Sequence, residues 1–153
     1  MLHILHTKQL IKSDLTSVWA FISSPKNLAK ITPEYMGFDI IGDLVNEKMF
    51  AGQIIEYHIK PIAGIKMHWV TEITQVKYLE YFVDNQKHGP YSIWHHKHFL
   101  KEVPGGVEMT DIVHYKLPFG ILGKIINAIF IKKKIKQIFD FRYKKIEELF
   151  NKI

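Results

Sequence analysis

Three histidines lie within four residues of one another in the segment 89–99, which has the sequence GPYSIWHHKHF. The segment is otherwise typical of a β-strand, and successive side chains of a strand point to opposite faces. Trp94, His96 and His98 are therefore expected to share one face. Two imidazoles on one face can act as metal ligands, as an acid–base pair, or as polar groups lining a pocket.

The next strand, expected over residues 106–117, offers partners for these histidines. The turn Pro-Gly-Gly at 104–106 makes the two strands antiparallel neighbours. A register in which paired residue numbers add up to 209 places His98 opposite Asp111 and His96 opposite Val113, beside Tyr115. A shift of one residue would turn this set of side chains to the other face.

Other strands add aromatic and polar side chains to the predicted interior. Trp69 and Thr71 share one face of an earlier strand, and Tyr57 is expected to join them. Phe82, Asp84 and Gln86 share a face of another strand. An unpaired buried polar group costs about 1–3 kcal/mol, so this mixture favours a wet or ligand-filled cavity over a sealed core. The predicted ligand-binding residues are Trp69, Trp94, His96, His98, Met109, Asp111, Tyr115 and Arg142.

Three interpretations of the histidines remain open from sequence. A metal site would need Asp111 as third ligand, and this loosely specified set leads us to predict no metal and no cofactor. Acid–base catalysis would use His98 oriented by Asp111, with Tyr115 or His96 polarising a carbonyl. The preferred interpretation is a hydrogen-bond network of His98, Asp111 and Arg142 that orients a ligand or braces the fold.

Length and composition indicate an ordinary globular chain, expected to form a single domain over residues 1–153. Hydrophobic residues make up 47% of the chain and charged residues 24%. The absence of cysteine excludes disulfides, thiol nucleophiles and cysteine-ligated zinc. Neither a signal-peptide pattern nor a long uncharged apolar run is present in the sequence, so the expected location is cytoplasmic.

The net charge of +6 belongs to one part of the sequence. Residues 119–153 contain nine Lys or Arg and three Asp or Glu, whereas the remainder contains twelve of each. No stacking aromatics or groove-reading motif accompany the charge, so we expect no nucleic-acid partner. The lysines at 132–136 are interpreted as the solvated back of a helix. The alternative is contact with a membrane surface, because Ile126, Ile129 and Phe130 precede them.

The pattern of elements predicts an α+β fold. A strand at 2–11 is followed by a helix with Ser13 as N-cap and by a second short helix that begins at Pro25. Period-two segments follow at 37–44, 52–60, 65–76, 78–86, 91–103 and 106–117. A long helix at 119–150 carries one apolar face, on which Arg142 also falls; its apolar members are Ile121, Ala128, Ile131, Ile135, Ile138, Phe139, Ile146, Leu149 and Phe150. We therefore predict a curved antiparallel sheet of about six to seven strands wrapped around this helix.

The sequence resembles the START-like, or SRPBCC, superfamily of polyketide cyclases, lipid-transfer domains and pollen-allergen-like proteins, and most narrowly its bacterial ligand-binding branch. The matching segments are VWAFISSPKNLAKITP, GPYSIWHHKH, MTDIVHYKLPFG and IFDFRYKKIEELF. The resemblance implies the helix-grip fold and a cavity for a small, mostly hydrophobic molecule. Because this superfamily hosts carriers, receptors and enzymes, a cyclase or dehydratase using His98 and Asp111 is the alternative function. No metal is expected in either case.

Overall fold

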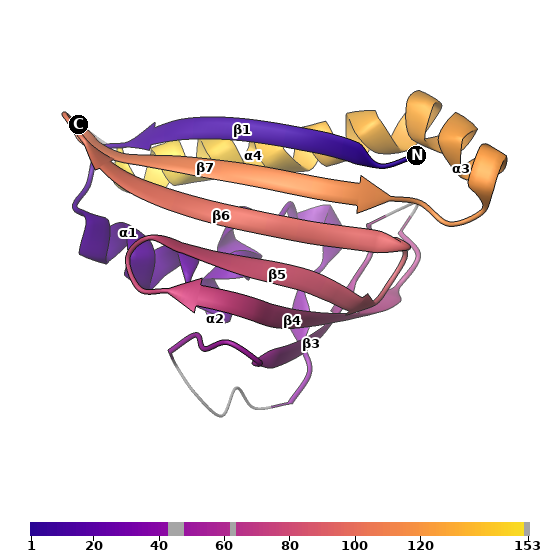
Figure 1. The fold of residues 1–153 in the computed structure, drawn as a ribbon, viewed down its shortest axis with the longest axis horizontal. Helices are drawn as coiled ribbons and strands as arrows, with labels where there is room; N and C mark the ends of the chain where they lie inside the picture. The colour runs from indigo at the N-terminus through magenta and orange to yellow at the C-terminus, as the bar shows by residue number, and fades with distance from the viewer. Residues whose placement is uncertain (43–47, 62–63, 152–153) are drawn as a thin grey trace.

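The computed structural model describes residues 1–42, 48–61 and 64–151. Seven strands form one antiparallel sheet in the order β1-β7-β6-β5-β4-β3-β2 (Figure 1). The strands are β1 (His3–Ile11), β2 (Asp39–Ile40), β3 (Ile54–Ile59), β4 (Met67–Lys77), β5 (Tyr81–His88), β6 (Ile93–Val103) and β7 (Gly106–Lys116). The first strand pairs with the last, so the two ends of the chain's β region meet in the sheet.

Helices lie at both ends of this strand region. Two short helices, α1 (Leu15–Ile22) and α2 (Pro25–Leu28), follow β1, and two single 3₁₀ turns, η1 (Ala29–Ile31) and η2 (Glu34–Met36), lead to β2. After β7 come α3 (Gly120–Ile126), a π-helical turn η3 (Asn127–Ile131) and the long α4 (Lys132–Phe150). Figure 1 shows α4 running behind β1 and β7. This architecture confirms the predicted α+β helix-grip fold.

The core forms where α4 packs against the inner face of the sheet. Val113 and Tyr115 of β7 cluster with Ile131, Ile135 and Phe139 of the helical region. A second cluster joins residues from both ends of the chain: it includes Ile11, Val18, Val107 and Ile146, all essentially inaccessible to solvent. Burying an aliphatic side chain of this size contributes about 1.5–3 kcal/mol, so these contacts hold α4 against the sheet.

The register of the β6–β7 hairpin is the predicted one. His98 pairs with Asp111 and His96 with Val113. Pro104 and Gly105 make the turn, and Gly105 and Gly106 both have positive φ. At Gly106 a Cβ would lie 2.1 Å from the carbonyl oxygen of Ile11, so only glycine fits there.

Several predicted boundaries were wrong. The N-cap of α1 is Asp14, not Ser13, because the Asp14 carboxylate accepts a hydrogen bond from the Ser17 N–H at 2.8 Å. The strand predicted from residue 78 begins at Tyr81, since Leu79 has a positive φ and forms a turn. Of the strand predicted at 37–44, only Asp39–Ile40 is a strand, and residues 43–44 lie outside the described residues.

The predicted helix at 119–150 is divided by the π-helical turn. The wheel that assumed regular α-helix therefore placed Ile121 wrongly, and this side chain is 76% exposed. Leu149, also predicted on the buried face, is exposed near the end of α4. The side chain of Ala128 lies outside the described residues. Among the described residues, no helix is long and apolar enough to cross a membrane.

Candidate ligand-binding site

A cavity of about 160 Å³ lies between the sheet and α4. Its wall is mostly apolar, and α4 contributes Ile135, Ile138 and Phe139. Strands β3 and β4 contribute aromatic and aliphatic side chains, and α2 adds Pro25 and Leu28. The volume exceeds that needed for a single water molecule many times over, so side chains do not fill the space under the helix.

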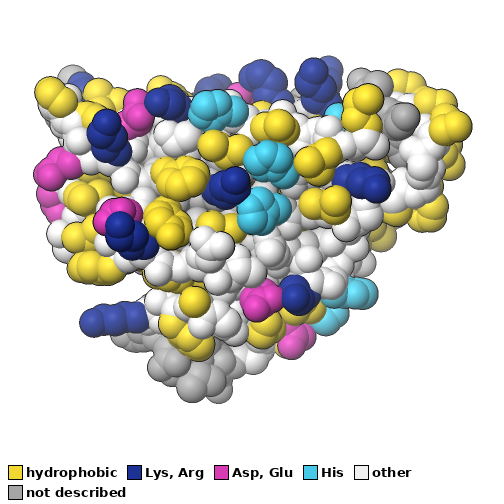
Figure 2. Space-filling view, viewed as in Figure 1, with side chains coloured by type: hydrophobic (Ala, Val, Ile, Leu, Met, Phe, Trp, Pro, Cys, Tyr) yellow, Lys and Arg dark blue, Asp and Glu magenta, His cyan; other side chains and the backbone are white. Residues whose placement is uncertain are grey.

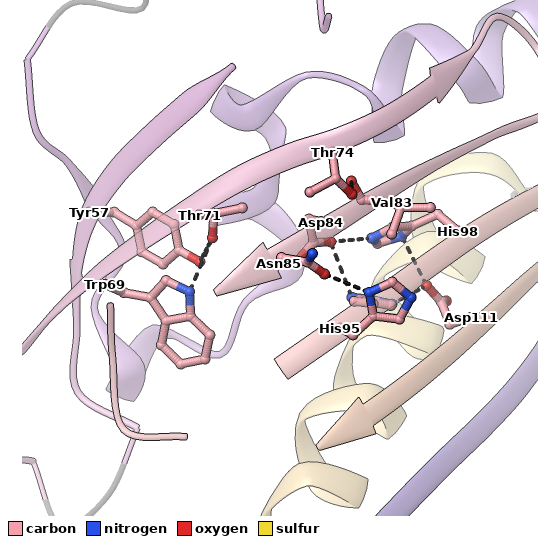
Figure 3. Close-up of polar contacts among 11 residues, drawn as sticks. Tyr57, Trp69, Thr71, Thr74, Val83, Asp84, Asn85, His95, His98 and Asp111 are labelled. Atoms are coloured by element: carbon pink, nitrogen blue, oxygen red, sulfur yellow. Dashed lines mark hydrogen bonds and ion pairs between the residues drawn. The ribbon is translucent and has the colours of Figure 1, made fainter. Parts of the chain in front are cut away.

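The polar atoms of the aromatic cavity wall form hydrogen bonds within the wall. The indole N–H of Trp69 donates to the hydroxyl of Thr71 at 3.1 Å, and the hydroxyls of Tyr57 and Thr71 are 3.0 Å apart (Figure 3). Burial raises the pKa of Tyr57, so its hydroxyl stays protonated. Trp94 packs edge-on against Trp69 with ring centroids 5.5 Å apart. These side chains therefore offer a ligand apolar surface rather than hydrogen bonds.

Two histidines and two carboxylates form a closed polar cluster at one place in this wall, and Figure 3 shows part of it. Asp111 Oδ1 lies 2.7 Å from His96 Nε2 and 3.0 Å from His98 Nδ1. Asp84 Oδ2 lies 2.8 Å from His98 Nε2 and 3.6 Å from His96 Nδ1. His96 and Asp111 are buried, and the side chains of His98 and Asp84 are 12% and 15% exposed. We call these four residues the His–Asp cluster.

The contacts indicate where the protons lie in the His–Asp cluster. Two contacts have hydrogen-bond geometry, His96 Nε2 with Asp111 Oδ1 and His98 Nε2 with Asp84 Oδ2, and each requires one N–H. His98 Nδ1 also lies 3.0 Å from Asp111 Oδ1, so each ring nitrogen of His98 faces a carboxylate, which favours its imidazolium form. The single hydrogen bond of His96 places its proton on Nε2. His96 Nδ1 is then an unprotonated nitrogen that borders the cavity.

The electrostatics agree with this assignment. Burial disfavours the charged form of His98, but hydrogen bonds to Asp111 and Asp84 outweigh it and raise its pKa above the ordinary value. Burial and the nearby charge of His98 lower the pKa of His96. Burial would raise the pKa values of both carboxyls, yet the hydrogen bonds and charges of the histidines hold them below their ordinary range. The pKa values of the two histidines are therefore shifted in opposite directions.

Arg142 of α4 borders the same cavity, and its charge helps to lower the pKa of Asp84 without a short ion pair between the two. Its Nε is buried without a hydrogen-bond partner, and among the described residues no carboxylate lies within ion-pair distance of its guanidinium. The guanidinium carbon sits 4.9 Å from the centroid of the Phe139 ring, which fixes the side chain against the helix. An acceptor atom of a bound molecule would satisfy this arginine.

The structure brings five of the eight predicted ligand-binding residues to the cavity: Trp69, Trp94, His96, His98 and Arg142. Asp111 lies behind the histidines and, with Met109, borders a second hollow on the other side of Arg142. Tyr115 lines neither space and packs against Ile135 and Phe139 in the core. Asp111 therefore contacts the two histidines of the cavity wall without lining the cavity itself.

Asp84 is the member of the His–Asp cluster that is absent from the predicted ligand-binding residues. Its alternation with Phe82 placed it on the inner face, but no register linked β5 to β6. The ladder pairs Asp84 with His96 and Phe82 with His98. The signal that could have found it is the pairing of β5 with β6, because a register that pairs Asp84 with His96 or His98 brings a carboxylate to the His-x-His motif.

Asp84, His96 and His98 are the residues that could hold a metal ion. One ligand atom from each lies within 4.8 Å of the others, so Asp84 occupies the place that the sequence interpretation gave to Asp111. The centroids of the two imidazole rings are 3.7 Å apart, and His96 Nδ1 and His98 Nε2 lie 3.6 and 2.8 Å from the same atom, Asp84 Oδ2. The 2.8 Å contact is a hydrogen-bond distance. The short contacts are accounted for by hydrogen bonds, and this geometry favours the hydrogen-bonded cluster.

Comparison with known proteins supports the fold. Neither a protein-family model nor a curated protein sequence matches the chain. Solved structures do match: a Chromobacterium violaceum protein aligns over 98% of both chains with 11% identity and a TM-score of 0.74. Major latex-like protein 151 of Panax ginseng aligns over 97% of both chains with 14% identity and a TM-score of 0.70. A Mycobacterium smegmatis protein aligns over 95% of this chain and 89% of its own, with 16% identity and a TM-score of 0.69.

These structural matches define the fold of the chain. The chain has the SRPBCC-like helix-grip fold, in which a curved antiparallel sheet surrounds a long C-terminal helix. The major latex-like protein is similar in structure to this chain over nearly its whole length, and the likeness concerns the fold.

Proposed function

We propose that this protein binds a small, mostly hydrophobic molecule in the cavity between the sheet and α4. The observation that carries the proposal is the cavity itself, an apolar space with one polar corner made by Asp84, His96, His98 and Arg142. Small-molecule sites generally combine an apolar wall with a few polar groups that set orientation. The helix-grip neighbours support the choice of a ligand-binding function over a purely structural one.

The polar corner supports a ligand that carries both a hydrogen-bond donor and an acceptor. His96 Nδ1 and Asp84 Oδ2, 3.6 Å apart, both accept hydrogen bonds, so a hydroxyl or N–H of the ligand fits between them. Arg142 donates, so it pairs with a carbonyl or similar oxygen. Two aspartates, one imidazolium and one guanidinium sum to zero charge, which suits a ligand that is neutral overall.

Native mass spectrometry of the freshly purified protein, compared with a denatured and extracted sample, tests the proposal. We expect a co-purifying organic molecule. Ile138→Trp places a larger side chain in the cavity wall and should remove the adduct, whereas Leu149→Trp, at an exposed position of the same helix, should retain it. An adduct of equal abundance in both variants would place the ligand elsewhere, and a bare chain in every preparation would count against a resident ligand.

A second candidate function is an enzyme of the cyclase or dehydratase type, favoured by the unprotonated His96 Nδ1 in the cavity. His98, protonated and held by two carboxylates, is poorly suited to be the base. In this candidate His96 accepts a proton from a carbon next to a carbonyl, and Arg142 stabilises the resulting enolate oxygen.

Hydrogen exchange separates the two functions. If His96 removes a carbon-bound proton, the co-purified molecule gains deuterium in heavy water with the wild-type protein and not with His96→Gln. If the molecule binds both proteins without exchange, the site is a binding site only. Adduct retention by His96→Gln is the required control.

A further inference from the structure

The start of the C-terminal helical region exposes an unusual amount of apolar surface. Seven large apolar side chains between residues 119 and 130 are exposed; Phe119 and Ile121 are each 76% accessible and Ile129 is 75% accessible. The seven, which we call the α3 patch, are Phe119, Ile121, Leu122, Ile125, Ile126, Ile129 and Phe130. Figure 2 shows hydrophobic side chains gathered at the end of the molecule where Figure 1 places α3.

The local backbone explains why the sheet does not cover this patch. Burial begins at Ile131, the last residue of the π-helical turn, and continues through Ile135 and Phe139 on α4. A π-helical turn adds one residue to a turn of the helix, which shifts the faces before and after it, so the apolar side chains of α3 do not continue the buried face of α4. At 100° per residue, Ile121, Leu122, Ile125 and Ile126 fall within an arc of about 140° on one side of α3. The patch is therefore a continuous apolar face.

Positive charge adjoins the patch directly. Residues 119–139 contain five lysines and no aspartate or glutamate. Lys136 is paired with Asp140 at 2.7 Å, and Lys134 lies 4.2 Å from the centre of the Tyr35 ring. Lys132 and Lys133 are exposed, and in the described part of the chain neither contacts a carboxylate.

We infer that the α3 patch and Lys132–Lys133 form a docking surface for an anionic lipid bilayer. An apolar helix face flanked by lysines matches the boundary between acyl chains and negatively charged headgroups. A second copy of the chain fits less well, because pairing through this surface would bring two lysine groups together with no acidic residue in the segment to offset them. The inference rests on this surface and not on the cavity.

Co-sedimentation with vesicles tests the inference. The protein is mixed with phosphatidylcholine vesicles, with and without phosphatidylglycerol, at low and high salt. We expect sedimentation with the anionic vesicles only, weakened by high salt. Ile121→Ser with Ile129→Ser, and separately Lys132→Ala with Lys133→Ala, should each lower the partition coefficient by about tenfold or more.

Matched controls come from elsewhere on the surface. Ile54→Ser on β3 removes an isoleucine that is 52% exposed and lies outside the α3 patch, and Lys144→Ala removes an exposed lysine farther along α4; both should leave binding unchanged. All variants should unfold like the wild type, because the altered side chains are exposed. No binding to anionic vesicles would overturn the inference, as would equal losses in the controls. Self-association that Ile129→Ser abolishes, without vesicle binding, would assign the patch to a second copy of the chain.

Discussion

His98 donates a hydrogen bond from Nε2 to Oδ2 of Asp84 at 2.8 Å, although the strand ladder pairs Asp84 with His96. The contact is thus diagonal across β5 and β6, and it fixes the imidazole between two carboxylates. The ring also stacks on Phe82 with centroids 4.0 Å apart. This arrangement makes His98 a fixed, protonated element of the cavity wall and leaves His96 as the histidine with a free nitrogen.

The two carboxylates of the His–Asp cluster should contribute unequally to stability. Asp111 is buried, forms a hydrogen bond with His96 and lies 3.0 Å from His98 Nδ1, so Asp111→Asn should lower the free energy of unfolding by about 3–5 kcal/mol. Asp84→Asn removes one short contact at a slightly more exposed position and should cost about 1–3 kcal/mol. Urea unfolding of the two variants measures the difference.

Glu108→Gln provides the control for these variants. Glu108 lies on the same strand as Asp111 but forms an exposed pair with Lys8, so its replacement should change stability by about 0.5 kcal/mol or less. If Asp84→Asn destabilised the protein as much as Asp111→Asn, the central role given to Asp111 would be wrong.

The raised pKa of His98 predicts a specific dependence of stability on pH. The folded protein holds the His98 proton more tightly than the unfolded chain, whose histidines titrate near pH 6.5. The stabilising contribution is therefore complete below about pH 6.5 and is lost as the pH rises through the folded pKa. Urea unfolding between about pH 6 and pH 9 should show a decline for the wild type that His98→Gln lacks. Parallel profiles would mean that His98 is not the imidazolium.

The fold and half of the cluster were predictable because strand alternation and turn chemistry are local signals. The Pro-Gly-Gly turn set the β6–β7 register, and with it the pairing of His98 with Asp111. The position of Asp84 was not predictable in the same way, because the connection from β5 to β6 does not set a register. The pairing of β5 with β4 was equally hard to predict, because its register shifts near Thr71 and Thr74.

The interruption of the C-terminal helix also escaped sequence reasoning, for a physical reason. A helical wheel assumes a constant angle per residue. The π-helical turn at Asn127–Ile131 breaks this assumption, so residues before the turn and residues after it cannot be placed on one wheel. Ile131, Ile135 and Ile146, which lie at or after the turn, are buried as predicted, whereas Ile121, which precedes it, is exposed.

Thr71 should contribute more to the free energy of unfolding than the size of its side chain suggests. Thr71→Val would leave the indole N–H of Trp69 and the hydroxyl of Tyr57 without their partner, at a cost of about 2–4 kcal/mol. Tyr57→Phe removes one member of the group but leaves Trp69 and Thr71 bonded, so it should cost about 1 kcal/mol. Urea unfolding compares them, and equal costs would show that water replaces Thr71.

Zinc should not stabilise the protein, because the imidazole nitrogens of the His–Asp cluster already form hydrogen bonds with Asp111 and Asp84. Thermal unfolding with and without added Zn²⁺ tests this expectation. A saturable rise in the midpoint that Asp84→Asn abolishes, and Glu108→Gln preserves, would instead establish a metal site at Asp84, His96 and His98.

Arg142 is predicted to serve ligand binding more than folding. Arg142→Met keeps an unbranched apolar stem against Phe139 and removes the charge, so the free energy of unfolding should change by about 1 kcal/mol or less. Occupancy of the cavity in native mass spectra should fall strongly, because a ligand oxygen loses its only cationic donor on the helix side of the described cavity wall. Lys144→Ala, a charge removal at an exposed site on the same helix, should leave occupancy unchanged. A large loss of stability in Arg142→Met with unchanged occupancy would make Arg142 a structural residue.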